Sequence, residues 1–162
     1  MVLEIIIIFS LVCITAYAIN IIEDINKKNK SKISFKEAMD LVELPIITFY
    51  NENKKLNFLL DTGSNVSYIN NSILPSINHK ILDKQNSTFG IEGNKVMNQF
   101  CSMDISYREQ AFNEEFSISN LDDAFNIIKQ EDGVQLHGIL GSRFFEKYRY
   151  VLDFKDLIAY IR

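Results

Sequence analysis

One carboxylate lies where a strand-like segment ends in a turn. Asp61 follows the apolar residues 58–60 and precedes Thr62, Gly63 and Ser64. Asp, Gly and Ser are common turn residues, so this stretch is compatible with a plain surface turn. A carboxylate can also act as a general base on water if its surroundings hold it in place and set its pKa. The stretch therefore allows two interpretations, a turn or a catalytic acid.

Catalysis by carboxylates on an amide commonly uses two of them. The two share one proton, because like charges in contact cannot both ionise, so that one activates water and the other protonates the amide oxygen. Other acids in the chain are poorer candidates: Asp132 follows a charged segment, and Asp153 follows a strand but lacks the Thr-Gly pair. A two-fold homodimer would bring Asp61 against its own copy. The sequence therefore predicts a site that is complete only in a homodimer.

The glycines indicate which segments meet at this site. Five of the six glycines lie in three short segments: DTG at 61–63, GIEG at 90–93 and GILG at 138–141. Glycine is used where the backbone approaches another group closely or adopts positive φ. In the predicted dimer, Gly63 would let the two loops approach, Thr62 would hydrogen-bond across the axis and Ser64 would orient the outer carboxylate oxygen.

The elements that position Asp61 are predicted to be strands. Residues 45–50 and 55–60 flank a turn and predict a hairpin that ends at Asp61. Residues 66–70 predict another short strand, followed by a helical turn. The two glycines in 87–96 predict a hairpin tip, and 137–162 predicts a strand, a short helical turn and a final strand pair.

Two helices are predicted outside these strands. Residues 34–44 have apolar residues at helical spacing, with Ser34 as a cap and Pro45 as the end. Residues 121–130 predict a second helix, capped by Asn120.

Composition argues against several classes of function. The net charge is −4 and the pI is about 5.2, which gives no electrostatic support for a nucleic-acid partner. Cys13 and Cys101 are the only cysteines, and His79 and His137 are far apart in sequence. Neither a disulfide nor a Cys or His metal site is therefore expected, and no cofactor is predicted.

The N-terminus predicts a membrane anchor. Ile5 to Ile22 carries no charge and is about the shortest stretch that can span a bilayer as a helix. Residues 16–18 (Ala-Tyr-Ala) also resemble a signal-peptide cleavage site, although Glu4 replaces the usual basic residue. A buried globular helix would need a polar face, which this stretch lacks.

The flanking charges bear on orientation and domain organisation. Five lysines between Lys27 and Lys36 follow the apolar stretch and favour a cytoplasmic domain by the positive-inside rule. We therefore expect a single-pass membrane protein with an anchor or uncleaved signal-like segment at 1–24, a charged tether and short amphipathic helix at 25–44, and a domain at 45–162.

Two motifs make residues 45–162 resemble a single-domain, retropepsin-like aspartic protease. LLDTGS at 59–64 matches the catalytic signature of that family, and HGILGS at 137–142 is similar to its second motif, two apolar residues and Gly before a short helix. The resemblance implies a mainly β fold, a closed antiparallel barrel with one or two short helices and a covering flap. It also implies a homodimer that hydrolyses peptide bonds with an activated water, without metal or covalent intermediate.

The resemblance assigns roles to individual residues. Asp61 would be catalytic, and the active-site loop would be supported by Thr62, Gly63, Ser64, Ile139, Leu140 and Gly141. The flap, matched only by order and glycine content, would contain Phe89, Gly90, Ile91 and Gly93. The chain departs from viral members at Ser64, where Ala is common in those proteins. It also departs at Ser142, because viral members place an Arg directly after the glycine of the second motif, whereas here Ser142 separates Gly141 from Arg143. The departure at Ser142 puts in doubt any ion pair of that Arg at the dimer interface.

Two other functions are compatible with parts of this pattern. Actin-like and sugar-kinase folds also use an Asp-x-Gly loop after a strand, but they need two large lobes, and 162 residues are too few. A catalytically inactive retropepsin-like module for dimerisation or peptide binding at a membrane is the main alternative, because a fold does not prove a reaction. The intact DTGS favours an aspartic-type endopeptidase acting on a polypeptide substrate.

Overall fold

The computed structural model describes residues 10–23, 32–89 and 95–161, without the side chains of 84–89 and 95–98. The chain divides into two units, Met1–Lys32 and Ile33–Arg162. The second unit therefore begins at Ile33, and it includes the residues of the predicted amphipathic helix.

The described part of the first unit is a helix over residues 10–23. Its large apolar side chains are exposed, including those of Leu11, Ile14 and Tyr17. Among the described residues, no helix has both the length and the apolarity needed to cross a bilayer. Residues 1–9 of the predicted anchor and residues 25–31 of the predicted tether lie outside the described residues, so both stay predictions.

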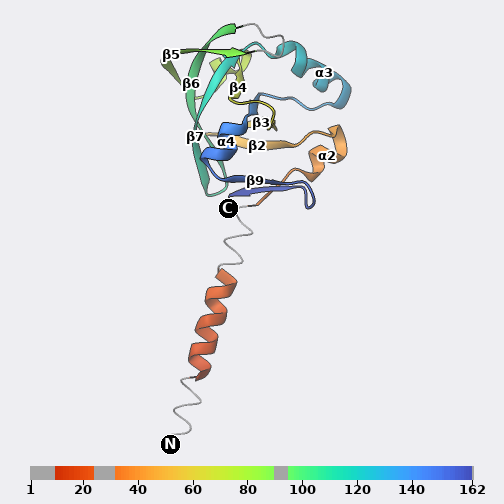
Figure 1. Cartoon of the computed structure of the whole chain (residues 1–162). Coiled ribbons are helices and arrows are strands. Elements are labelled where there is room, and N and C mark those ends of the chain that lie inside the picture. Colours follow the sequence, from red (N-terminus) through yellow and green to blue (C-terminus); the bar gives the residue numbers. More distant parts are fainter. Residues whose placement is uncertain (1–9, 24–31, 90–94, 162) are drawn as a thin grey trace, which may run out of the picture. The chain divides into compact units, whose positions relative to one another are not determined.

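The second unit is built around a closed ring of strands (Figure 1). Its seven-stranded sheet has the order β2 (Ile46–Asn51), β3 (Lys54–Leu60), β8 (Gly138–Leu140), β4 (Ser67–Asn70), β7 (Gln110–Ser119), β6 (Lys95–Tyr107) and β5 (Lys80–Phe89). A pairing of Tyr50 in β2 with Ser106 in β6 closes the ring over six of these strands. The expectation of a mainly β, closed barrel is confirmed.

The barrel is mostly antiparallel, but two of its strand pairs are parallel. β8 comes from late in the chain and inserts between β3 and β4, parallel to β3 and antiparallel to β4. β4 is also parallel to β7. These parallel pairs arise because β8 and β4 join strands that lie far apart in sequence, and distant strands can approach in either direction.

Alternating burial explains why these segments form the barrel. In β3, Leu56, Phe58 and Leu60 are buried while the residues between them are less so. Because side chains alternate along a strand, every second side chain of β3 points into the interior of the barrel. There, Phe58 stacks on Phe116 with ring centroids 5.6 Å apart, and Phe49 meets Phe112 edge to face at 5.7 Å. The core is thus a cluster of aromatic rings inside the barrel.

A second sheet completes the unit. It has the order β1 (Ile33–Ser34), β10 (Ile158–Ile161) and β9 (Tyr150–Asp153), and Ile33 pairs with Ala159. Both of these side chains are buried in the main core. The two-residue strand β1 therefore ties the start of the compact unit to its end.

The described part of the compact unit has more helices than the one or two expected. They are α2 (Lys36–Val42), α3 (Asp122–Asp132), α4 (Ser142–Lys147) and a 3₁₀ helix, η1 (Asn71–Ser76). The predicted caps Ser34 and Asn120 each lie one residue before the N-cap, which is Phe35 in α2 and Leu121 in α3, and neither N-cap residue makes a side-chain cap bond. Ser34 Oγ and Asn120 Oδ1 still accept hydrogen bonds from the backbone N–H of Lys36 (3.2 Å) and of Asp122 (3.1 Å). α2 lies against β2 and α3 (Figure 1). A smaller apolar cluster around Ile46, Phe125 and Leu136 fills the space between them.

Candidate active site

Asp61 lies in a tight turn directly after β3. Its carboxylate oxygen Oδ1 accepts a hydrogen bond from the backbone N–H of Gly63 (2.9 Å), and its carbonyl oxygen accepts one from the N–H of Ser64 (3.3 Å). The side chain of Asp61 is half-buried. An Asp that accepts from the backbone two residues on fixes its own turn. The carboxylate therefore has a defined direction while it stays accessible.

Strand β8, which comes from the C-terminal part of the chain, makes backbone hydrogen bonds to this turn. β3 and β8 run parallel with Leu60 paired to Leu140, and the N–H of Asp61 donates to the carbonyl of Leu140 (3.0 Å). At the other end of the turn, the N–H of Ser142 donates to the carbonyl of Ser64 (2.7 Å). Two backbone hydrogen bonds thus bracket the Asp61 turn, defined here as residues 61–64.

Gly141 lies between these two bonds and has no room for a side chain. A Cβ there would lie 2.4 Å from the carbonyl oxygen of Val66 and 3.0 Å from that of Ser64. Contacts below 3.0 Å are essentially absent from real Cβ atoms, so any other residue would displace the backbone. Glycine is needed here for close approach of two chain segments.

The structure places the two predicted motifs side by side. Leu140 and Gly141 are buried next to the Asp61 turn, and Ile139 pairs with Leu59 and with Tyr68. The neighbourhood that the resemblance implied is therefore present.

The predicted role of Ser64 in orienting the carboxylate is not what the single chain shows. Ser64 Oγ donates to the carbonyl of Val66 (2.7 Å), whereas the bond to Asp61 Oδ1 comes from Gly63. The hydroxyl satisfies a nearby backbone acceptor, as Ser side chains in turns often do. Thr62 and Gly63 are exposed. The contact of Thr62 across a dimer axis stays a prediction.

The predicted flap is only partly described. β5 and β6 pair antiparallel as far as Phe89 with Lys95, which gives the two arms of the hairpin. Gly90, Ile91 and Gly93 lie outside the described residues, as does the side chain of Phe89. The assignment of these residues to substrate binding stays a prediction.

A buried polar chain behind the turn was not predicted from the sequence. Ser67 Oγ accepts a hydrogen bond from the N–H of Gly141 (3.3 Å) and donates one to Glu114 Oε1 (3.0 Å), and Lys147 Nζ lies 3.3 Å from Glu114 Oε2. Glu114 is 5% exposed. Burial raises the pKa of the Glu114 carboxyl, and Lys147 and the Ser67 hydrogen bond act in the opposite direction. A signal was present, because Glu114 occupies an inward-facing position of an alternating segment.

His137, directly before β8, makes two hydrogen bonds to the backbone of Asn57. Its Nδ1 accepts from the N–H of Asn57 (3.0 Å), and its own N–H donates to the carbonyl of Asn57 (2.9 Å). Burial, together with the charge of Lys54, lowers the pKa of His137. The residue extends the β3–β8 pairing beyond its last regular pair.

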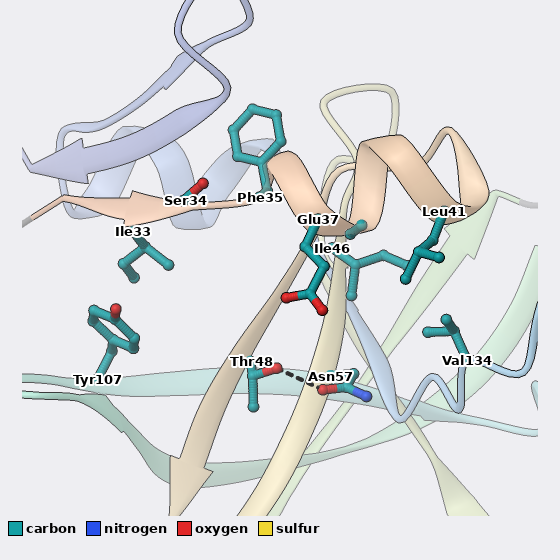
Figure 2. Close-up of a pocket in the computed structure, with 11 residues that line it drawn as sticks. Ile33, Ser34, Phe35, Glu37, Leu41, Ile46, Thr48, Asn57, Tyr107 and Val134 are labelled. Atoms are coloured by element: carbon teal, nitrogen blue, oxygen red, sulfur yellow. Dashed lines mark hydrogen bonds between the residues drawn. The ribbon is translucent and has the colours of Figure 1, made fainter.

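An apolar hollow beside α2 has no residue of the Asp61 turn in its lining. Figure 2 shows a cavity of about 250 Å³ lined by residues of β1, α2 and β2 together with Tyr107 and Val134. A hydrogen bond of 2.7 Å from Thr48 to Asn57 crosses its floor. Among the described residues, no group of three or more His, Cys, Asp or Glu side chains is placed to hold a metal ion.

Comparisons with known proteins gave structural likenesses only. No protein-family model and no curated protein matches the chain. The fold is similar to the EIAV protease in complex with the inhibitor HBY-793, with 15% identity, a TM-score of 0.47, and coverage of 67% of this chain and 90% of that one. It is also similar to the retroviral protease-like domain of Ddi1 from Leishmania major, with 10% identity, a TM-score of 0.48, and coverage of 73% and 87%.

Proposed function

We propose that the chain is an aspartic-type endopeptidase that acts as a homodimer. The observation that carries the proposal is the Asp61 turn itself. An Asp-Thr-Gly-Ser segment has its carboxylate oriented by Gly63, and it is bracketed by backbone bonds from Leu140 and Ser142. A surface turn needs neither the bracket nor the glycine at 141 that makes it possible.

The proposed chemistry requires two copies of the turn. The two Asp61 carboxyl groups would share one proton: the ionised group takes a proton from water, which attacks the peptide carbon, and the protonated group gives its proton to the amide oxygen. Such a pair titrates as a unit, so neither role belongs to one chain. The exposure of Thr62 and Gly63 in the single chain supports this arrangement, because a second copy needs access to them. The proposed substrate is a polypeptide.

The experiment compares Asp61→Asn with Asp153→Asn in the full chain. Asp153 is a matched control because it is the last residue of β9 and its carboxylate accepts backbone N–H groups in the turn that follows. We expect Asp61→Asn to lower the rate of cleavage of an unfolded polypeptide by at least about 100-fold. The control should cleave like the wild type, and both variants should sediment as dimers.

Two results would contradict the proposal. One is equal cleavage by the wild type and Asp61→Asn. The other is a folded, dimeric wild type that cleaves at no pH between acid and neutral, which would favour the non-catalytic module.

We also propose that the N-terminal segment attaches the chain to a membrane, with the compact unit in the cytoplasm. The uncharged stretch 5–22, the lysines after it and the exposed apolar side chains of the helix over 10–23 support this. The full chain should sediment with membranes after a salt wash, and a chain lacking 1–24 should not. Recovery of the full chain in the supernatant would refute the attachment.

A further inference from the structure

The carboxylate of Glu114 is buried behind the Asp61 turn, and nothing in the proposed reaction uses it directly. We propose that Glu114 is a positioning residue: through Ser67 it holds the backbone of Gly141, and thereby the turn that carries Asp61. The catalytic consequence of this role rests on the proposed function, whereas the positioning itself does not.

The location of Glu114 requires an explanation beyond packing. It lies on the inward face of β7 between the buried residues Phe112 and Phe116, where an apolar side chain would be expected. Burying a carboxylate is costly unless it is paired and hydrogen-bonded. Ser67 and Lys147 provide both, one at each carboxylate oxygen. Lys147 is held as well, because its Nζ also donates to the carbonyl of Asn113 (2.7 Å).

Ser67 transmits the effect of the carboxylate to the backbone. A serine hydroxyl has one proton to donate and two lone pairs to accept with. Because that proton points to Glu114, a lone pair of Oγ is left facing the N–H of Gly141, 3.3 Å away. The ionised carboxylate can only accept, so it fixes the direction of the hydroxyl. A protonated Glu114 could itself donate to Oγ and would no longer fix it.

Gly141 then carries the effect to Asp61. The residue before it accepts the hydrogen bond from the N–H of Asp61, and the residue after it donates to Ser64. Its Cα lies against the carbonyl of Val66 so closely that no Cβ would fit. A shift of the Gly141 backbone must therefore move both ends of the bracket, because the contact leaves no free space to absorb it.

The charges around Glu114 come from two elements. Arg143 and Lys147 both belong to α4, and Glu115 follows Glu114 in β7. These side chains and Ser67 line a cavity of about 150 Å³. Burial raises the pKa of Glu114, Lys147 lowers it, and Glu115 raises it slightly further. The ionisation of Glu114 therefore takes place at a higher pH than that of an exposed glutamate.

The test is a pH titration of the Gly141 amide signal in the ¹⁵N-labelled full chain. We expect this signal to shift with pH in the wild type, and to stop doing so in Glu114→Gln and in Ser67→Ala. Glu115→Gln is the matched control, one residue away on the exposed face of β7, and it should keep the shift. Ser67→Thr restores a hydroxyl and should restore the shift, which separates positioning from a general loss of packing.

The amide titration tests the positioning role of Glu114 whether or not the chain cleaves peptides. A Gly141 signal that does not shift in the wild type, or that still shifts in Glu114→Gln, overturns it. Loss of the shift in Glu115→Gln as well would also overturn it, because the effect would then belong to charge in general.

A kinetic comparison extends the test to the reaction. In Glu114→Gln and Ser67→Ala, kcat should fall about 10-fold to 100-fold with KM little changed, and Ser67→Thr should recover most of it. Unchanged kcat in both variants, in a wild type that cleaves, contradicts the proposal. If no form cleaves, the proposed function fails, and the amide titration alone decides the role of Glu114.

Discussion

The turns after β3 and after β9 have the same local design and different surroundings. Asp61 Oδ1 accepts the N–H of Gly63 at 2.9 Å, and Asp153 Oδ1 accepts the N–H of Lys155 at 3.0 Å. In both, an acid ends a strand and ties the backbone two residues on. Local sequence therefore produces the same turn twice.

What differs is the origin of the other contacts. The turn at Asp153 joins the neighbouring strands β9 and β10, and residues 154–156 are exposed. The Asp61 turn is bracketed by Leu140 and Ser142, which come from about half a chain away. A turn therefore becomes a candidate site through the strand inserted beside it. Asp-Thr-Gly-Ser sets the conformation, and β8 sets the position.

The largest expected effect comes from breaking the bracket at Gly141. In Gly141→Ala the added methyl would lie 2.4 Å from the Val66 carbonyl oxygen, and a buried backbone cannot move away freely. We expect a loss of about 3 kcal/mol in the free energy of unfolding, measured by urea denaturation. Cleavage should be lost with it.

Gly133→Ala is the control for this prediction. Gly133 is the C-cap of α3 with φ of 74°, and a Cβ there meets nothing within 4 Å. The cost should be about 1 kcal/mol, from the left-handed backbone alone. If Gly141→Ala costs no more than Gly133→Ala, the bracket is not the feature that distinguishes the Asp61 turn.

Much of the fold around Asp61 follows from local signals. The hairpin of β2 and β3, the strand β4, the helices α2 and α3 and the tail from β8 to β10 were predicted, since each has a clear period or a turn residue. The compact unit begins at Ile33, in strand β1. A two-residue strand such as β1 has no period of its own, and its pairing with Ala159 is a contact between the two ends of the compact unit.

At the site, too, contacts between distant parts of the chain were harder to predict than local ones. The proximity of Gly141 to the Asp61 turn was expected from the resemblance, whereas the direction of the Ser64 hydroxyl was not foreseen. A hydroxyl rotates to suit its neighbours, so sequence does not specify its partner. Glu114 could have been found, because an acid between Phe112 and Phe116 breaks an alternating apolar face. Its partners Ser67 and Lys147 come from other elements and only the fold brings them together.

A smaller effect is expected at the other end of β8, where His137 joins the strand to β3. Burial lowers the pKa of His137, so the folded chain keeps it neutral at a pH where the unfolded chain, with an ordinary pKa of about 6.5, takes up a proton. The unfolded state then binds more protons, and stability falls as the pH drops through this window. In His137→Asn the side-chain oxygen can still accept from the N–H of Asn57, but it does not titrate. The variant should therefore lose less stability than the wild type on acidification.

The measurement is the free energy of unfolding by urea between about pH 7 and about pH 5, where the histidine contribution appears. His79→Asn is the matched control, because it removes the other histidine from a position before β5 that is not part of the β3–β8 pair. The slope of His137→Asn should be flatter than that of both the wild type and the control. Equal slopes in the two variants would mean that acid acts on the fold elsewhere. In that case the hold of β8 on the Asp61 turn would depend on Gly141 and its neighbours, without a contribution from the start of the strand.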